Sequence, residues 1–463
     1  MTPRTIITIA ACLAGVYAAP ATSTSSAAAP LITTASQLAS ALNGLTQGAP
    51  ANFASGYASV MKSIRPQAGP TSIADAATQL QALYAKHQND PFGLAADILL
   101  NGVAGPQDID DLTGFSPVCN SFRNANFIPP SRPIYPKKDP ADAPYDLPES
   151  TLRAAIYIPP GFTYGRKPPI VLIPGTGVYA CETFYSNFVK LVRGSDYADV
   201  VYLNIPDALL DDLQTSAEYV AYALNYISSI SGNTQVSTIS WSAGSVAGQW
   251  ATKYWPSTRN ITKDRINVSA DYHGTILAPL ICPPGLPCPP SVLQQFYNSR
   301  FVQTLRNNGG SSAYTTTTTN TDSLGAKVWS IYDEIVEPQQ NPNASASIQD
   351  ARNVGVLNAQ IQDICGLASV AGAPNFGHEA ALYNAVTFAL GRDALRNNGP
   401  ANVARSGALA ACGNFTAGGL DLADVLATEA TIPLAGFRIV TYPRRVVVEP
   451  AIKSYALKDA PPA

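Results

Sequence analysis

The sequence predicts an α/β fold in which a mostly parallel central sheet is flanked by helices and preceded by an N-terminal helical segment. Residues 170–173 and 200–203 are apolar throughout, which is the pattern of strands covered on both faces. Helical periodicity follows over 208–230 and again after Gly244. Further apolar strands are expected at 236–240, about 266–270 and about 328–332. This alternation indicates a parallel sheet, which binds ligands beyond the carboxyl ends of its strands.

The composition excludes some classes of binding partner. The chain has 463 residues, of which 46% are hydrophobic and 13% are charged, and its net charge is −3. This balance is typical of a globular protein and lacks the basic surplus of a nucleic-acid-binding protein. Every apolar stretch is too short, or too interrupted by polar residues, to span a bilayer. We expect a monomer with no nucleic-acid partner and no transmembrane segment.

The N-terminus has the pattern of a cleaved signal peptide. Arg4 precedes a mostly apolar run over residues 6–16, and Val16 and Ala18 are small residues at the spacing of a cleavage site. We therefore assign residues 1–18 to a signal peptide and expect a secreted, extracellular protein.

The cysteines that remain after residue 18 are even in number, which in an exported chain argues for disulfides. Cys282 and Cys288 bracket a proline-rich loop and can close it locally. The other four allow three connectivities, which the sequence leaves open; they are Cys119, Cys181, Cys365 and Cys412. Four N-x-S/T sequons are glycosylation candidates, at Asn260, Asn267, Asn343 and Asn414.

The segment 19–110 is predicted to be helical and to precede a larger α/β domain at 111–463. After an Ala/Ser/Thr-rich start, it carries three amphipathic patterns, over about 38–45, 53–64 and 73–84. The third begins at Ser72, with Asp75 at capping-box spacing. Each pattern has a single apolar stripe, so these helices must pack on one another or on the rest of the chain. A pro-segment and an accessory domain both remain open.

The stretch VSTISWSAGS, residues 236–245, predicts a strand that turns into a helix at Ser242. This is how a nucleophile elbow presents its serine, although the usual pattern is G-x-S-x-G. Gly244 satisfies the second small position, and Ser240 replaces the first glycine with another small residue. A surface turn is the alternative, but the apolar strand before Ser242 and the helical pattern after it favour the elbow.

A serine nucleophile requires a base, and the chain has only three histidines. His87 lies before the sheet begins, and His273 comes too soon after the elbow for the order serine, acid, histidine. His378 follows the last predicted strand and is therefore the candidate base. Asp333 stands where the strand at about 328–332 ends, which suits an acid that orients the imidazole. Glu334, one residue further on, is expected to be a solvated acid.

A turn that follows the strand at 170–173 predicts an oxyanion hole. Thr176 lies between Gly175 and Gly177, which let the backbone approach a substrate. Its N–H, and the N–H of Ala243 directly after the nucleophile, are the expected donors. The sequence carries neither a zinc-site spacing nor a nucleotide-binding loop. No metal and no cofactor are expected.

Seven segments together resemble the fungal lipase B family, the Candida antarctica lipase B type. In chain order, between about Leu172 and Cys412, they read LIPGTG, SWSAG, ADYHGT, SVLQQ, TLRNNGG, YDEIVEP and GRDALR. The resemblance implies an α/β-hydrolase that cleaves carboxylic esters without a cofactor. It places the nucleophile, acid and base on Ser242, Asp333 and His378, and the oxyanion donors on Thr176 and Ala243.

The resemblance also implies roles around the substrate. Trp241 falls where the family has the tryptophan that floors its alcohol pocket, and Val178, Asp271 and Gln295 fall at positions around the substrate pocket. Cys365 and Cys412 match a family disulfide, whereas the other four cysteines do not match. Residues 277–297 fall where the family has a small lid, and the helical segment 31–110 has no counterpart there.

These features predict a secreted serine ester hydrolase that cleaves triacylglycerols or related esters through an acyl-enzyme. An esterase for short-chain, aromatic or polymeric esters is the nearest alternative. A serine peptidase shares the same triad chemistry, but the apolar rim at 277–297 favours esters. A non-catalytic protein with a hydrolase fold is disfavoured, since each catalytic role has a candidate.

Overall fold

The computed structural model describes residues 30–46, 52–104, 118–314, 326–397 and 400–462. Residues 31–463 form one compact unit, which thus includes both the N-terminal helices and the α/β domain. The predicted signal peptide at 1–18 and the predicted boundary at 110–111 lie outside the described residues.

A seven-stranded sheet forms the centre of this unit, in the order β1-β3-β2-β4-β5-β6-β7. The short β1 runs antiparallel to β3, and every other pair is parallel. The predicted mostly parallel sheet is therefore confirmed. The strands are β1 (Ile156–Tyr157), β2 (Pro169–Ile173), β3 (Asp199–Leu203), β4 (Val236–Trp241), β5 (Thr262–Val268), β6 (Ala326–Trp329) and β7 (Leu357–Gln360).

Helices cover both faces of the sheet because its central strands are apolar on both sides. In β2, Ile170 and Leu172 pack into one core, and the alternate residues Val171 and Ile173 pack into another. The first core is completed by α7 (Ala180–Phe184), α15 (Ala385–Arg396) and α18 (Leu422–Glu429), and the second by α6 (Glu149–Ala154), α9 (Leu213–Ile230), α10 (Ala243–Tyr254) and α13 (Arg300–Arg306).

Several predicted boundaries were wrong. The helix expected over 208–230 begins only at Leu213, because residues 207–209 have φ between 52° and 59° and are left-handed. Asp212 then caps α9 by accepting the N–H of Gln214 at 2.9 Å. The last predicted strand ends at Trp329, so Asp333 lies in the following loop. Neither β1 nor β7 was predicted, since β1 has two residues and β7 alternates apolar residues with Asn358 and Gln360.

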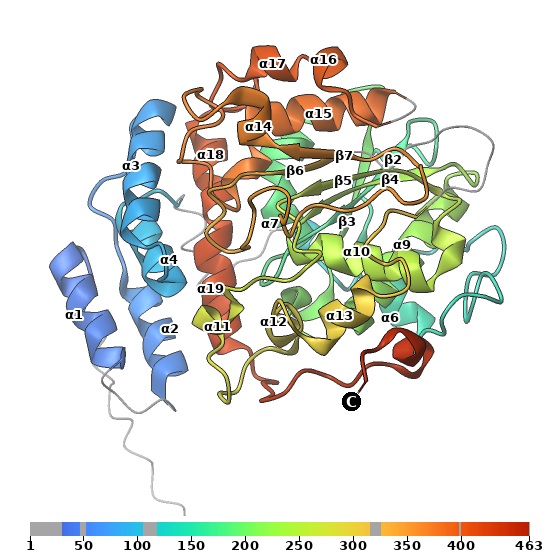
Figure 1. Ribbon diagram of the computed structural model, residues 1–463, viewed down its shortest axis with the longest axis horizontal. Helices are drawn as coiled ribbons and strands as arrows, with labels where there is room; N and C mark the ends of the chain where they lie inside the picture. Colours follow the sequence, from blue (N-terminus) through green and yellow to red (C-terminus); the bar gives the residue numbers. More distant parts are fainter. Residues whose placement is uncertain (1–29, 47–51, 105–117, 315–325, 398–399, 463) are drawn as a thin grey trace, which may run out of the picture. The chain divides into compact units, whose positions relative to one another are not determined.

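The three predicted N-terminal helices are present as α1 (Ala35–Thr46), α2 (Phe53–Ser63) and α3 (Ile73–Lys86). A fourth, α4 (Pro91–Leu100), was missed because residues 93–100 are buried on every side and show no single apolar stripe. Of these helices, α2 and α4 pack against α19 (Thr431–Thr441) and α3 packs against α18, beside the sheet (Figure 1), while α1 packs on α2 and α4. The N-terminal segment therefore shares the first core of the α/β domain.

The remaining helices are short. They are α8 (Lys190–Val192), α11 (Ala278–Ile281), α12 (Pro290–Gln294), α14 (Ile361–Cys365), α16 (Val403–Ser406) and α17 (Ala408–Ala411). No helix within the described ranges is both long and apolar enough to cross a membrane.

Three disulfides join the six cysteines and resolve the connectivities that the sequence left open. Cys365 pairs with Cys412, and Cys282 pairs with Cys288 across the proline-rich loop. The third bond joins Cys119 to Cys181.

Three of the four sequons, at Asn260, Asn343 and Asn414, are exposed. The prediction for Asn267 was wrong. This residue lies in the central strand β5 with 1% of its surface exposed, and its Oδ1 accepts a hydrogen bond from Ser240 Oγ at 2.7 Å. A buried amide in the middle of the sheet has no room for a glycan in the folded chain.

Candidate active site

Ser242 lies at a sharp turn between β4 and α10. Its backbone has φ 52° and ψ −134°, which is a strained conformation for a residue other than glycine. The Ser242 N–H donates to Val268 O at 3.0 Å, and α10 starts at the next residue. At Gly244 an added Cβ would lie 2.3 Å from Pro174 O, so that position requires glycine. The turn has the geometry predicted for a nucleophile elbow.

Ser240 accounts for the missing first glycine of the elbow. Its side chain is buried, and its hydroxyl lies 2.7 Å from Asn267 Oδ1 and 2.9 Å from Ser245 Oγ. A hydroxyl that is bonded to both the neighbouring strand and the following helix fits this site without leaving a buried polar group unpaired. The serine therefore ties β4 to β5 and α10 directly beneath the turn.

His378 and Asp333 form a buried pair beside the turn. Asp333 Oδ2 lies 2.8 Å from His378 Nδ1, and Asp333 Oδ1 accepts the N–H groups of Ile335 and Val336 at 3.0 and 2.7 Å. Burial lowers the pKa of His378, but Asp333, with Glu334 and Asp271, more than offsets this effect, so the pKa stands above its usual 6.5. An imidazole held in this way is oriented to accept a proton at its other nitrogen.

The backbone of His378 is fixed as well as its side chain. Glu334 Oε2 accepts the His378 N–H at 3.0 Å. The His378 carbonyl oxygen accepts from Trp241 Nε1 at 3.1 Å and from Ser269 Oγ at 2.9 Å. The expectation that Glu334 is a solvated acid was therefore wrong: its carboxyl turns inward, and burial raises its pKa well above the usual 4.5.

The two predicted oxyanion residues flank the turn. At Gly175 an added Cβ would lie 3.0 Å from Ser242 Cβ, so the loop that carries Thr176 passes directly beside the serine. The Thr176 hydroxyl pairs with the side-chain amide of Gln295, whose Nε2 lies 3.0 Å from Thr176 Oγ1 and also donates to Ser291 O at 2.9 Å. Gln295 thus fixes Thr176, and Ala243 opens α10, where helix N–H groups are free to bind an anion.

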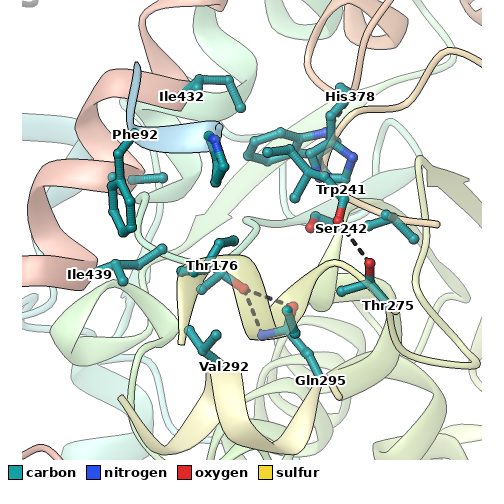
Figure 2. Close-up of a pocket in the computed structure, with 17 residues that line it drawn as sticks. Phe92, Thr176, Trp241, Ser242, Thr275, Val292, Gln295, His378, Ile432 and Ile439 are labelled. Carbon is teal, nitrogen blue, oxygen red and sulfur yellow. Dashed lines mark hydrogen bonds between the residues drawn. The ribbon is translucent and has the colours of Figure 1, made fainter. Parts of the chain in front are cut away.

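One apolar pocket brings these groups together. Ser242 and His378 lie side by side in it, with Trp241, Thr176 and Gln295 in its walls (Figure 2). The pocket leaves about 70 Å³ for water-sized molecules. Other walls come from α11, α12 and α19, through Ala278, Ile281, Val292, Ile432, Ala435, Gly436 and Ile439. The segment 277–297 therefore forms one side of the pocket.

Two predicted pocket residues lie elsewhere. Val178 is fully buried in the first core and is not among the described residues that line the pocket. Asp271 is also fully buried, and neither of its carboxyl oxygens has a hydrogen-bond partner within the described residues. Burial raises the pKa of Asp271 to about 7, while the nearby His378 lowers it. Asp271 is thus an electrostatic neighbour of His378 behind the pocket.

The other two histidines are set in different surroundings. His87 Nε2 lies 2.7 Å from Asp97 in the N-terminal segment. Burial lowers the pKa of His273 to about 4, and its N–H donates to Ser345 Oγ at 3.2 Å.

Sequence reasoning missed the wall that the N-terminal segment supplies. Pro91 and Phe92, in the first turn of α4, line the pocket, and Phe92 lies across it from Trp241 and His378 (Figure 2). The Asp90–Pro91 pair is a helix-start signal: the Asp90 side chain accepts the Gly93 N–H at 2.9 Å, and proline suits the first helical position. That signal identifies the helix, but the sequence carries no sign that the helix faces the elbow.

Comparisons with known proteins agree with this geometry. The chain is 30% identical to lipase B of Pseudozyma antarctica over 319 residues, which is 68% of this chain and 87% of that protein. The crystal structure of Aspergillus fumigatus lipase B is 39% identical with a TM-score of 0.80, and the match covers 90% of this chain and 98% of that one. That match is longer than residues 111–463, so it extends into the N-terminal segment, which was expected to have no counterpart. No family model matches the chain.

Proposed function

We propose that this chain, which belongs to the lipase B family and is a carboxylic ester hydrolase, cleaves triacylglycerols or related esters through an acyl-enzyme on Ser242. The fold is that of an α/β-hydrolase. One observation carries the mechanism: Ser242 at a strained elbow and His378, which is paired with the buried Asp333, line a single apolar pocket.

In this mechanism Ser242 Oγ attacks the ester carbonyl carbon, and His378 Nε2 takes the hydroxyl proton. The imidazolium is stabilised by Asp333, which accepts from Nδ1 at 2.8 Å. His378 then donates the proton to the departing alcohol oxygen, leaving an acyl-enzyme. Water, activated by the same imidazole, releases the acid and restores Ser242.

The N–H groups of Thr176 and Ala243 are the proposed donors to the oxyanion. The Thr176 hydroxyl, fixed by Gln295, is a third group beside the same position. Preorganised donors of this kind each contribute on the order of 10²–10³ in rate. The position of Ala243 at the start of α10 adds the positive end of the helix dipole.

The lining of the pocket supports an ester with an apolar acyl group. Phe92, Ile281, Val292, Ile432 and Ile439 present only hydrocarbon to the space in front of Ser242. The small size of that space, about 70 Å³, favours a second candidate, an esterase for short acyl chains. A long chain requires α11 or the first turn of α4 to move outwards.

We also propose that the protein is secreted. Three disulfides join all the cysteines of the described residues, which suits an oxidising compartment. The proposed signal peptide at 1–18 can be tested by N-terminal sequencing of the mature protein.

The function is tested with p-nitrophenyl esters of increasing acyl length and an emulsified triacylglycerol, on wild type and Ser242→Ala. We expect hydrolysis of both substrate types by the wild type and only residual hydrolysis by the variant. Full activity in Ser242→Ala would contradict the mechanism. Hydrolysis of the shortest esters alone would replace the lipase assignment with the short-chain esterase.

A further inference from the structure

A buried cluster of three glutamates and two tyrosines lies directly behind His378. We call it the carboxyl–tyrosine cluster, and its members are Glu334, Glu379, Glu429, Tyr84 and Tyr383. Glu334 follows the acid of the proposed triad, and Glu379 follows its histidine. Glu429 is the last residue of α18, and Tyr84 belongs to α3 in the N-terminal segment. Segments from both ends of the chain thus meet at the loop that carries His378.

Hydrogen bonds join four members of the cluster to one another, and Glu334 bonds the His378 loop itself. The Tyr84 hydroxyl lies 2.8 Å from Glu379 Oε1 and 3.2 Å from Glu429 Oε2. The Tyr383 hydroxyl donates to Glu429 Oε1 at 2.7 Å. Glu334 accepts the backbone N–H of His378. The His378 loop is therefore held on one side by Glu334 and on the other by Glu379.

Gly377 shows how closely the loop is held. A Cβ at that position would lie 2.2 Å from Glu334 Oε2 and 2.9 Å from Tyr84 Cζ. The loop therefore passes between Glu334 and Tyr84 at a distance that only glycine permits. Tyr84 touches the residue before His378 and hydrogen-bonds the residue after it.

The cluster holds together only if it retains a proton. Glu379 is fully buried, and its Oε2 has no hydrogen-bond partner within the described residues. The carboxyl groups of Glu379 and Glu429 are close enough to share a proton. Two carboxyl groups can bond only when one of them is protonated. Burial, with Glu429 beside it, raises the pKa of Glu379 well above 4.5, and burial raises that of Glu429 to about 7. Glu379 is accordingly the group that keeps the proton, while Glu429 accepts from the hydroxyl groups of Tyr84 and Tyr383.

We propose that Tyr84 is a positioning residue for His378, and that the N-terminal segment acts on the reaction through it. The Tyr84 hydroxyl fixes Glu379 and Glu429, and these fix the loop whose histidine must meet Ser242 and Asp333. The inference rests on the proposed function, because it requires His378 to be the base. Tyr84 is not among the described residues that line the active-site pocket, so it acts through the loop and not on the substrate.

The charged and titratable groups around this cluster come from several elements. Glu379 faces Tyr84 from α3, Glu429 from α18, Glu334 from the loop after β6, and Tyr383. His378 faces Asp333, Glu334 and Asp271. The Tyr84 hydroxyl has one proton, which lies within reach of an oxygen of Glu379 and an oxygen of Glu429. This contact lowers the cost of keeping the two carboxyl groups buried.

The test uses Tyr84→Phe in the full chain, with Tyr222→Phe as the matched control. Tyr222 of α9 also donates to a glutamate at 2.8 Å, to Glu149, and it belongs to the second core. Both variants keep the ring and lose one hydroxyl. For wild type and the tyrosine and glutamate variants, kcat and KM for a short p-nitrophenyl ester are measured per functional site, counted by titration with a p-nitrophenyl phosphonate. Ser242→Ala has no serine to titrate at that position and is compared per mole of protein.

We expect Tyr84→Phe to lower kcat by about tenfold with KM unchanged, and Tyr222→Phe to match the wild type. A second pair of variants, at Glu379, distinguishes a positioning effect from misfolding. The side chain of Glu379→Gln can still donate to Glu429 and accept from Tyr84, whereas that of Glu379→Leu can do neither. The kcat of Glu379→Gln should stay within about twofold of the wild-type value. The kcat of Glu379→Leu should fall as far as that of Tyr84→Phe.

Wild-type kcat in Tyr84→Phe, or equal kcat in the two Glu379 variants, would overturn the inference while Ser242→Ala stays inactive. Full activity in Ser242→Ala would instead overturn the proposed function, so the two failures are distinguishable.

Discussion

Asp333 and Glu334 are consecutive residues that hold the same histidine at different atoms. Asp333 Oδ2 accepts from the His378 side chain at 2.8 Å, while Glu334 Oε2 accepts from the His378 backbone N–H at 3.0 Å. The first contact is made to the imidazole and fixes its tautomer, whereas the second is made to a backbone group. The two acids therefore have separate tasks, and exchanging each for its amide should separate them.

Asp333→Asn should lower kcat by roughly 10⁴-fold, since an amide no longer stabilises the imidazolium or its tautomer. Glu334→Gln should cost less than about tenfold, because an amide oxygen still accepts the His378 N–H. The kcat values of Asp333→Asn and Glu334→Gln are compared by steady-state kinetics on one soluble ester. A severe Glu334→Gln defect beside a mild Asp333→Asn defect would move the proposed acid to Glu334.

The pH dependence of kcat/KM should depend on the charged groups around His378. Neutral imidazole is the base, so kcat/KM rises as pH rises through the pKa of His378, which lies above 6.5. Asp271 has a pKa of about 7, so it becomes negatively charged over the pH range in which His378 titrates. This negative charge raises the pKa of His378. Asp271→Asn should therefore move the acidic limb to lower pH. An unmoved limb would show that Asp271 is not coupled to His378.

The carboxyl–tyrosine cluster should make stability depend on pH. Glu379 has a raised pKa in the folded chain, so the stability that its proton contributes is complete below the unfolded value of 4.5 and is lost as pH rises above it. The Tm of the wild type should fall as pH rises above 4.5. In Glu379→Gln the fall should be smaller, since an amide carries no proton to lose. Parallel Tm curves for the two proteins would contradict a protonated Glu379.

The first turn of α4 should limit the acyl length that the pocket accepts. Phe92→Ala removes the ring that faces the pocket and should raise kcat/KM for a long-chain ester relative to a short one by about tenfold. Phe127→Ala is the control, because Phe127 is 89% exposed and the variant should keep the wild-type ratio. An unchanged ratio in Phe92→Ala would place the acyl chain on another wall, such as α19.

The residues of the site that could be predicted from the sequence are those whose catalytic role only a few residue types can fill. Three histidines and a strict chain order leave His378 as the candidate base. A strand predicted to end at about 332 indicates Asp333, although the strand ends at Trp329. A tight turn tolerates Ser240 because serine is small, and the structure adds the reason that its hydroxyl is bonded to Asn267. Local patterns thus indicate which residues can react.

What the sequence could not show depends on contacts between distant segments. Phe92 and His378 are separated by most of the α/β domain, and no periodicity connects them, yet both line the pocket. Glu334 has the sequence context of a solvated acid because its partners, the His378 backbone and the buried cluster, come from other segments. Asn267 fits a sequon because the motif does not record that its strand is central in the sheet.

The most direct test of the proposed mechanism is the mass of the covalent intermediate. Wild type and Ser242→Ala are mixed with p-nitrophenyl butyrate, quenched in acid during turnover, digested and analysed by mass spectrometry. We expect a butyryl group on the peptide that contains Ser242 in the wild type, and none in Ser242→Ala. A butyryl group on another residue, or turnover that persists in Ser242→Ala, would contradict the mechanism.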